Sequence, residues 1–510
     1  MKNYVIAHDL GTTGNKATLY DREGKLVGSA FYGYDTEFAH AGWAEQNPED
    51  WWQAVCVSTR KLLADADVPK DDIACVTFSG QMMGCVPLSR DGHALHNSII
   101  WADTRSVAQE RWLAERISRE DVYLISGHRL SASYAITKIL WFREHCPETY
   151  ENTYKFVHAK DAVIARLTGV FVTEPSDASS MNLYDINRWC WSEPIVEAAQ
   201  LDPDKLPDVR RSIDVVGEIR ADIADEVGLL AGTPVVIGGG DGPCAATGAG
   251  VVREGLAYAY IGSSSWIALA MPRPVVDPKQ RTFTFAHIIP NTLTPTGAMQ
   301  AAGASYQWAR NQLASPETER AHALDENAYE LMNVTAAQSP IGAKGLLYLP
   351  YLMGERSPYW SAIARGAFIG LTMRHTRADM LRAVLEGVTM NLRLILDCFT
   401  DQNVRIDAVR VIGGGASGRF WNQIMANVFG LPVQRLAFLG EATSMGAALA
   451  GGIGVGLYPG WDMADQMNPV RETFEPDAAT QARYAELVPI FAAAYQQLVP
   501  VYESLASFDR

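Results

Sequence analysis

Cysteine is scarce in this sequence, and its few copies form no recognisable motif. The seven cysteines are scattered, odd in number and without a C-x-x-C pair. These features argue against a disulfide framework and against a zinc site built from paired cysteines. They fit a protein of a reducing compartment, so we expect a cytoplasmic location.

Basic clusters and long apolar runs are missing as well. The formal net charge is -15 and the isoelectric point lies near 5.2, with no basic block in the chain. Because binding to nucleic acid or anionic membranes relies on clustered Lys and Arg, we expect neither partner. Residues 1–9 offer too short an apolar run for a signal peptide, and no later run approaches the ~18 to 20 residues of a membrane span.

What the chain does have is enough apolar material for several cores. It contains 510 residues, of which 48% are hydrophobic. A chain of this length typically divides into roughly two to four domains. We therefore expect a large globular protein with more than one domain.

Two patterns recur along the chain. A strand, a small-residue turn and a second strand span residues 4–20, and the same order recurs over residues 256–270. A strand over 233–237 ends in a Gly-Gly-Gly-Asp-Gly turn at 238–242, and a later strand ends in a Gly-Gly-Gly turn at 413–415. Such turns can recur by chance in α/β proteins, but here both patterns appear in the same order.

The two glycine turns differ at one chemically important position. Asp241 stands where the second copy has Ala416, so only one half carries an acid. We interpret the pattern as a duplicated fold with chemistry at the junction of its halves. The predicted domains are residues 1–249 and 250–510.

Three helices are indicated by caps and periodicity. Asn47, followed by a proline and two acids, predicts a helix over about 48–65. Residues 376–379 resemble a capping box with Asp in place of Glu, and a long apolar periodicity follows. The segment 478–506 carries an apolar stripe at helical spacing, which we interpret as core packing.

Residues 9–16 are suited to binding phosphate. Backbone N–H groups and the hydroxyls of Thr12 and Thr13 could surround phosphate oxygens while Lys16 offsets their charge. The segment is neither a Walker A loop nor a Rossmann fingerprint. An ordinary hairpin with an Asx-type turn is the alternative interpretation.

Asp241 is the candidate general base. A carboxylate that follows a buried strand on a glycine turn can reach a substrate hydroxyl and accept its proton. The alternative is that Asp241 caps a helix beginning near Pro243, and both interpretations can hold together.

These features resemble the FGGY family of carbohydrate kinases, within the wider sugar kinase, heat-shock chaperone and actin fold. Residues 301–308, 349–358, 366–371 and 379–386 resemble further segments of that family. The resemblance covers essentially the whole chain. It implies an α/β fold of two duplicated ribonuclease H-like domains with a cleft between them.

The resemblance also implies roles for individual residues. Asp241 matches the catalytic base, and Asp9 with Asp241 is expected to hold Mg²⁺ through water. The positions that match nucleotide-binding residues are Gly11, Thr12, Thr13, Lys16, Gly262, Ser263, Gly303, Gln307, Gly414 and Gly415. The implied cofactors are ATP and Mg²⁺, and the implied reaction is in-line phosphoryl transfer to a primary hydroxyl.

Within the family, residues 43–51, 79–82 and 100–105 resemble segments of xylulokinases, so D-xylulose is the first candidate substrate. The expected sugar-side residues are Gln81, Met82, Met83, Asp103, Arg105, Asp241 and Gly242. Xylulokinases usually have His in place of Met83 and Asn in place of Gly242. Because both changes remove hydrogen-bonding groups, we expect them to weaken or redirect substrate choice.

Several alternatives stay open from the sequence. The acceptor could be ribulose, gluconate, glycerol or another polyol, and a non-catalytic sugar or nucleotide sensor could keep the same fold. Asp103 and Arg105 could instead form a surface ion pair. His8 in a strand is expected to be structural. The resemblance favours a homodimer, with nucleotide on the second half and sugar in the first.

Overall fold

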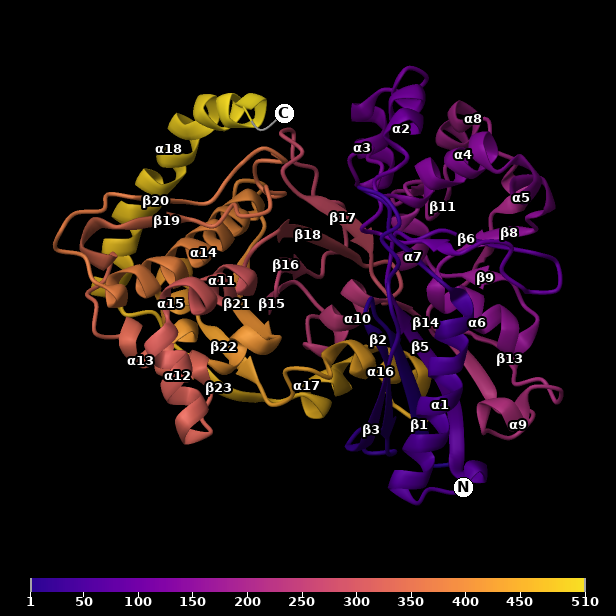
Figure 1. The fold of residues 1–510 in the computed structure, drawn as a ribbon. Coiled ribbons are helices and arrows are strands. Elements are labelled where there is room, and N and C mark those ends of the chain that lie inside the picture. Colours follow the sequence, from indigo (N-terminus) through magenta and orange to yellow (C-terminus); the bar gives the residue numbers. More distant parts are fainter. Residues whose placement is uncertain (1, 509–510) are drawn as a thin grey trace.

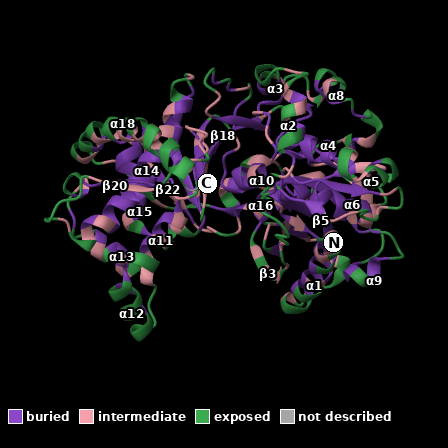
Figure 2. Ribbon diagram, turned by 45° about the horizontal axis from the view of Figure 1, so that its top comes forward, coloured by how far each residue is buried: buried purple, intermediate pink, exposed green. Residues whose placement is uncertain are grey.

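The computed structural model describes residues 2–508, which form two lobes joined at a central junction (Figure 1). Buried residues concentrate in the sheets and in the helices that face them, whereas exposed residues cover the outer helices (Figure 2). Across residues 2–508, no helix combines the length and the apolar character needed to traverse a bilayer.

The first lobe is built on a six-stranded sheet. Its central strands are parallel: β1 pairs with β5, and β5 pairs with β14. The sheet order is β13 (Val215–Glu218), β14 (Pro234–Gly240), β5 (Ile73–Gly80), β1 (Tyr4–Leu10), β2 (Gly14–Tyr20) and β3 (Leu26–Gly33). The predicted opening hairpin is therefore confirmed as β1 and β2.

The second lobe repeats this arrangement in a seven-stranded sheet. The predicted second hairpin is confirmed as β15 and β16, and β15 pairs in parallel with β21. The order is β17 (Phe283–Ala286), β18 (Leu293–Met299), β16 (Ser265–Leu269), β15 (Gly255–Ile261), β21 (Ile406–Ile412), β22 (Val433–Leu436) and β23 (Val470–Phe474).

The expected equivalence of the two glycine turns is wrong. In the first sheet, β5 lies between β1 and β14, whereas β21 lies directly beside β15. The counterpart of β21 is therefore β5, and the counterpart of β14 is β22. Local sequence did not show this because neighbours in a parallel sheet are set by long crossover connections, not by the pattern within a strand.

Two helices cross at the junction and cover the opposite sheets. Helix α10 (Asp241–Gly248) follows β14 and packs in a core with Tyr258 and Ile412 of the second sheet. Helix α16 (Ala442–Gly454) follows β22 and packs in a core with Val5 and Val236 of the first sheet. This exchange ties the two lobes together.

The alternation of side chains along β1 explains how both faces of the first sheet are covered. Val5 and Ala7 face α16, whereas Ile6 and Leu10 face a core with Trp51 and other residues of the outer helices. These outer helices are α1 (Pro48–Ala66) and α6 (Ala159–Thr168). Period-two burial of this kind is what a strand covered on both sides requires.

The predicted helices are confirmed. Helix α1 begins after Asn47, whose side chain accepts the N–H of Glu49. Helix α14 (Arg377–Thr400) begins with the capping box formed by Thr376 and Asp379. The terminal helix α18 (Ala478–Phe508) buries Phe491, Tyr495 and Tyr502.

The remaining main helices flank the two sheets. An inserted layer of the first lobe contains α2 (Val107–Ala114), α3 (Arg119–Ser126), α4 (Ala135–His145), α5 (Pro147–Asn152), α7 (Pro175–Ser180) and α8 (Glu193–Ala199). The second lobe adds α11 (Gly303–Leu313), α12 (Ser315–Leu324), α13 (Ala328–Ala336), α15 (Arg419–Phe429) and α17 (Ala464–Met467).

Candidate functional site

Asp9 lies near the end of β1, at the edge of the sheet where the parallel strands finish. It pairs in register with Lys16 of β2 and Ser79 of β5. Burial raises the pKa of Asp9 to about 6, although Ser79 and Lys16 oppose this shift. A carboxylate held in this way is still partly accessible and can face a ligand.

Asp241 is the first residue of α10, directly after β14. Because β1, β5 and β14 run in parallel, their carboxyl ends bring Asp9 and Asp241 to the same edge. Burial, followed by the negative charge of Asp9, raises the pKa of Asp241 to about 7. The charge of Asp9 therefore acts on the ionisation of Asp241.

The capping interpretation of Asp241 does not hold as stated. The helix begins at Asp241 itself, and the residue at its N-cap is Gly240. The Oδ1 atom of Asp241 accepts the N–H of Gly242, at 2.7 Å, rather than an N–H deeper in the helix. The carboxylate therefore lies at the N-terminal end of α10.

Glycines before Asp241 allow a close approach of the chain. A Cβ on Gly238 would lie 1.8 Å from the carbonyl oxygen of Phe78, and Gly238 has a φ of +72°. A Cβ on Gly240 would lie 2.7 Å from Sδ of Met82. The predicted sugar-side residue Met82 therefore packs directly on the turn that carries Asp241.

The other residues of the 81–83 segment are held by backbone and amide contacts. Nε2 of Gln81 donates to Oε1 of Gln46 at 2.7 Å, and the buried Oε1 of Gln81 has no partner among the described residues. Met83 has a φ of 66°, and its carbonyl accepts Nζ of Lys138 at 2.8 Å. Gly242 has open space around it, since a Cβ there would meet nothing closer than Met82 Sδ at 3.9 Å.

Asp103 and Arg105 form a buried ion pair, which corrects the surface-pair alternative. Nη2 of Arg105 lies 2.6 Å from Oδ2 of Asp103, and both side chains are 1% exposed or less. Arg105 also pairs with Glu45 at 2.6 Å, and its guanidinium lies 3.6 Å from the ring of Trp43. These contacts hold the segment around Trp43 in place. Direct contact of Asp103 or Arg105 with sugar stays a prediction.

The predicted first phosphate loop lies beside Asp9. Gly11 N donates to Gly14 O at 3.0 Å, and Oγ1 of Thr12 accepts Nε1 of Trp101 at 2.9 Å. Thr13 is exposed. Lys16 reaches the second lobe, where its Nζ donates to Gly440 O at 2.8 Å.

The predicted residues of the second lobe also come together. Ala302 N and Gly303 N donate to the carbonyls of Ser263 and Gly262 at 2.9 and 2.8 Å. A Cβ on Gly415 would lie 2.3 Å from Cγ2 of Ile261, the residue before Gly262. The three turns therefore meet at one edge of the second sheet.

Gly414 and Gln307, which also belong to the predicted nucleotide-binding residues, face open space. A Cβ on Gly414 would meet nothing within 4 Å. Gln307 is exposed on α11, one turn after Gly303. This edge therefore has room for a ligand.

Aromatic residues of the second lobe also reach the Asp241 turn, although no pattern in the sequence points to them. Oη of Tyr258 donates to Gly242 O at 2.9 Å and accepts Nε1 of Trp266 at 2.7 Å. The ring of Tyr260 stacks on Trp266 with centroids 4.2 Å apart. In sequence these side chains look like ordinary strand residues, so only the tertiary structure identifies them.

His8 is structural, as expected. Its ring contacts Asn15 and Thr59 at 3.0 and 3.2 Å and stacks on Phe78. Burial lowers the pKa of His8 to about 3, so the ring is neutral.

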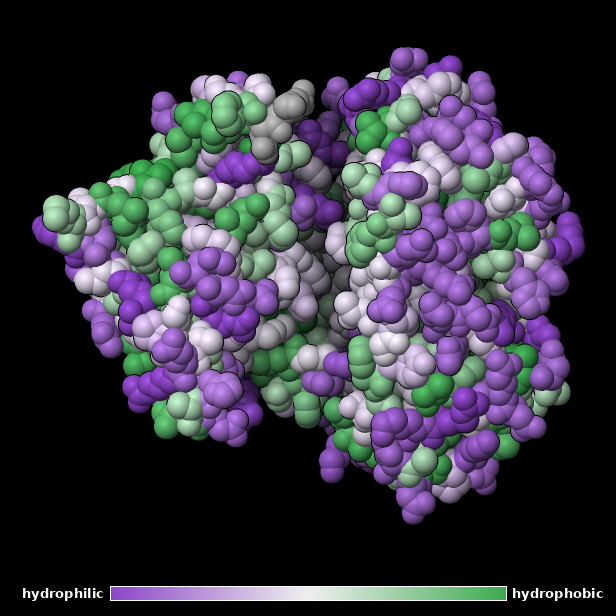
Figure 3. Space-filling model, viewed as in Figure 1, coloured by the Kyte–Doolittle hydropathy of each residue, from purple (hydrophilic) through white to green (hydrophobic). Residues whose placement is uncertain are grey.

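The β1–β2 hairpin and the Asp241 turn both contact the second lobe, through Lys16 and Gly242. Figure 3 shows a groove between the two lobes. Adjacent carboxylates such as Asp9 and Asp241 are hard oxygen donors of the kind that Mg²⁺ prefers, and it usually keeps several waters. The residues present therefore fit a hydrated magnesium ion.

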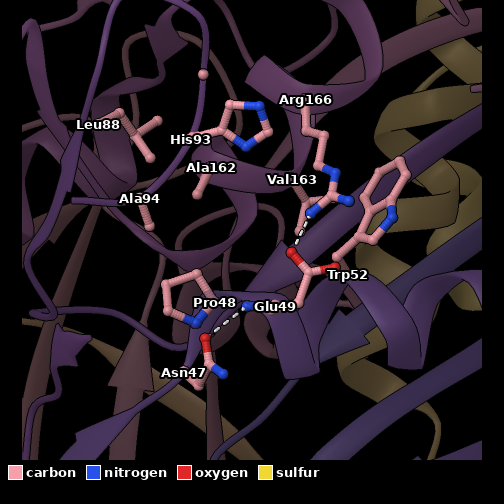
Figure 4. Close-up of a pocket in the computed structure, with 11 residues that line it drawn as sticks. Asn47, Pro48, Glu49, Trp52, Leu88, His93, Ala94, Ala162, Val163 and Arg166 are labelled. Atoms are coloured by element: carbon pink, nitrogen blue, oxygen red, sulfur yellow. Dashed lines mark hydrogen bonds and ion pairs between the residues drawn. The ribbon is translucent and has the colours of Figure 1, made fainter. Parts of the chain in front are cut away.

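A separate pocket of about 140 Å³ lies in the first lobe, between the start of α1 and α6 (Figure 4). Its lining includes Asn47, Trp52, His93 and Arg166, and Arg166 is already paired with Glu49. None of the predicted site residues lines this pocket.

Comparisons with known proteins agree with this geometry. Residues 4–248 match the FGGY family of carbohydrate kinases, N-terminal domain, and residues 257–455 match its C-terminal domain. The xylulose kinase of Bacillus subtilis is 34% identical over 99% of both chains, and the gluconokinase of Bacillus licheniformis is 29% identical over 100% of this chain and 99% of its own. The crystal structure of ligand-bound xylulose kinase from Lactobacillus acidophilus superposes with a TM-score of 0.91 at 26% identity, over 98% of this chain and 99% of the other.

Proposed function

The chain belongs to the FGGY family of carbohydrate kinases, and on that basis we propose that it transfers the terminal phosphoryl group of ATP to a primary hydroxyl of D-xylulose, giving D-xylulose 5-phosphate. The observation that carries the proposal is the pair of carboxylates, Asp9 and Asp241, at the junction of the lobes. A sugar kinase needs a base for the acceptor hydroxyl and fixed groups for the phosphates, and this junction offers both.

Asp241 is the base in this proposal. Its pKa of about 7 is close to neutral pH, where a base combines useful ionisation with useful proton affinity. The open space at Gly242 and the packing of Met82 on the turn leave room for an acceptor hydroxyl beside the carboxylate.

The nucleotide is assigned to the second lobe. Gly262, Ser263, Gly303, Gly414 and Gly415 would surround it, with Gln307 on the adjoining helix. A bound Mg²⁺ would neutralise phosphate charge, and Asp9 and Asp241 would hold it through water. Thr12, Thr13 and Lys16 would orient the transferred group from the first lobe, since this chemistry depends on positioning and electrostatics.

The same proposal extends to the roles of the two halves of the chain, to the location of the protein and to its partners. Residues 1–249 would bind the acceptor and residues 250–510 the nucleotide, and the groove between them would close to exclude water. We also propose a cytoplasmic homodimer without nucleic-acid or membrane partners, in keeping with the acidic composition.

A sugar acid such as gluconate is the second candidate acceptor. Relatives named gluconokinase match the full chain, and Met83 and Gly242 depart from the usual xylulokinase residues. Arg356 is our candidate partner for such an acid, because its guanidinium has no hydrogen-bond or ion-pair partner among residues 2–508. The next residue, Ser357, bonds Ala298 O at 2.8 Å, and Ala298 packs in a cluster with the predicted sugar-side residue Met82. Burial lowers the pKa of Arg356, and interactions with Tyr134 and Glu355 oppose this shift.

A coupled assay of ADP release tests these proposals. We expect D-xylulose to give acceptor-dependent ADP release, and Asp241→Asn to lower kcat by about 10² to 10⁴ while nucleotide binding persists. Equal ADP release without acceptor would indicate an ATPase, and none across D-xylulose, D-ribulose, glycerol and gluconate would indicate a sensor. Arg356→Met separates the two acceptors, because it would impair only the acid.

A further inference from the structure

A buried polar cluster lies behind the glycine turn that leads to Asp241. We call it the turn frame, and it consists of Lys160 on α6, Glu174 and Ser176 at the start of α7, Asp177 and Ser212. These side chains are fully or almost fully buried. They lie directly behind the turn, where hydrogen bonds from them can hold it in place.

The frame bonds both ends of the turn. Gly240 N donates to Oγ of Ser176 at 2.9 Å, and Ser176 Oγ donates to Oε1 of Glu174 at 2.6 Å. Gly238 N donates to Ser212 O at 3.0 Å, and Ser212 Oγ donates to Oε2 of Glu174 at 3.1 Å. Both backbone N–H groups are thus linked to one carboxylate through a serine.

Lys160 offsets part of the negative charge around Glu174. Nζ of Lys160 lies 3.7 Å from Glu174, 2.5 Å from Asp161 and 3.0 Å from Asp177. Burial favours a neutral Lys160, but the three carboxylates outweigh it and raise the pKa of Lys160, so its ammonium persists. Asp177 meets this ammonium as an ion pair, while its two carboxylate oxygens have no hydrogen-bond partner among the described residues.

Asp177 of the turn frame also belongs to a neighbouring group that has the composition of a metal site. Ligand atoms of His158, Asp161 and Asp177 lie within 4.8 Å of one another, which is a spacing that a metal could use. The ammonium of Lys160 already contacts both carboxylates. The cluster therefore carries its own cation.

The turn needs such support because its glycines supply none. Three successive glycines have high conformational freedom, and they have no side chains of their own through which contacts could hold them. Ser176 is also fixed from its other side, because its own N–H donates to Oε2 of Glu174 at 2.8 Å. The hydroxyl is therefore held in place before it accepts from the turn.

We infer that Ser176, held by Glu174, is a positioning residue that fixes the direction of Asp241. This inference rests on the proposed function, in which Asp241 is the base. A misplacement of about 1 Å can lower the rate by roughly 10²-fold without changing ground-state binding. Loss of the Ser176 hydroxyl leaves Gly240 N without a partner and frees the turn.

The test is a graded series of variants in the full-length protein. Ser176→Ala should lower kcat by roughly 10- to 100-fold, with the KM values for ATP and acceptor within about 2-fold of wild type. For Ser176→Cys, whose thiol is a weaker acceptor, we expect a kcat between those of Ser176→Ala and the wild type. Ser192→Ala is the matched control, because Ser192 is 2% exposed and its hydroxyl also accepts a backbone N–H, from Ile195 on α8.

A crystal structure of Ser176→Ala provides a readout that does not depend on activity. We expect the 238–242 turn to shift while the strands keep their places, and Ser192→Ala to leave the turn unchanged. An unchanged turn, normal turnover in Ser176→Ala, or an equal loss of turnover in Ser192→Ala would each overturn the inference. If the wild type phosphorylates nothing, the proposed function fails, and the turn geometry still decides the role of Ser176.

Discussion

At the scale of single residues, the most informative relation is between Asp9 and Asp241. Each lies at the end of a parallel strand, and each has a pKa raised chiefly by burial. The negative charge of Asp9 is the second largest cause of the shift at Asp241. Two nearby carboxylates cannot ionise independently, so the state of one affects the chemistry of the other.

The raised pKa predicts how activity depends on pH. Asp241 accepts a proton only when it is ionised, so kcat/KM for the acceptor should rise with pH and level off above about 7. Asp9→Asn removes a negative charge and should move the midpoint of that rise to lower pH, even as it reduces the rate. A pH profile of kcat/KM for both proteins checks this. A midpoint unchanged by Asp9→Asn would contradict the electrostatic link.

At the scale of elements, α10 and α16 cross with a close backbone approach at the junction. A Cβ on Gly446 would lie 1.9 Å from Cys244 O, and a Cβ on Gly248 would lie 1.8 Å from Ala442 O. The crossing is thus nearly symmetric, as expected for helices that follow the equivalent strands β14 and β22. Glycine is required at both places because backbone meets backbone.

Substitution of Gly446 tests this crossing. Gly446→Ala should push α10 away from α16, lower the free energy of unfolding by about 1 to 3 kcal/mol and reduce kcat, because α10 carries Asp241. Gly460→Ala is the control, since a Cβ there meets nothing within 4 Å. Denaturant unfolding and turnover of both variants provide the measurement. Equal effects at the two glycines would contradict the account.

The start of α14 offers a second test at this scale. Asp379 accepts Thr376 N at 2.7 Å and Ser339 Oγ at 2.7 Å, and it pairs with Lys344 at 2.9 Å. Burial would raise the pKa of Asp379, but these hydrogen bonds outweigh it and hold the pKa below its ordinary value of 3.8.

Asp379→Asn should therefore lower the free energy of unfolding by about 1 to 3 kcal/mol at neutral pH. A depressed folded-state pKa stabilises the protein above the unfolded value, and that contribution is lost as the pH falls toward the folded value. The difference between wild type and variant should accordingly shrink below about pH 4. Urea unfolding at several pH values measures it, and a constant difference would show that the charge is not involved.

At the scale of the whole molecule, contacts across the junction set the distance between the lobes. Lys16 of the first lobe bonds Gly440 of the second, and Tyr258 of the second bonds Gly242 of the first. Ser179 on α7 also accepts the N–H of Ala286 on β17, at 3.0 Å. The lobes thus also meet through polar contacts and small apolar clusters on either side of the crossed helices.

Closure of the groove is the prediction at this scale. A non-hydrolysable ATP analogue and acceptor together should reduce the radius of gyration measured by small-angle scattering, because the proposed sites lie on facing lobes. The groove of the Asp241→Asn variant should still close when both ligands are added, since the variant keeps both binding surfaces. A radius that does not change with both ligands would contradict the assignment of nucleotide and acceptor to different lobes.

Much of the fold could be predicted from sequence because its signals are local. The hairpins β1–β2 and β15–β16 follow from alternating strands and small-residue turns, and α1 and α14 follow from their caps. The site was predicted less completely. Asp9 lies near the end of a strand and Asp241 follows one, so both could be chosen. Tyr258, Ser176 and Glu174 instead act through Gly242, Gly240 and Ser212, which lie 16, 64 and 38 residues away in the chain.

By itself, the sequence determined which segments become strands and helices and which turns bear an acid or a row of glycines. Only the tertiary structure decided that β21 corresponds to β5 rather than to β14, that Arg105 is buried against Asp103, and that α10 and α16 exchange sheets. The physical reason is the range of the interactions. Periodicity, capping and turn formation act within a few residues, whereas parallel-strand order and buried charge pairs depend on segments that meet only after the chain has folded.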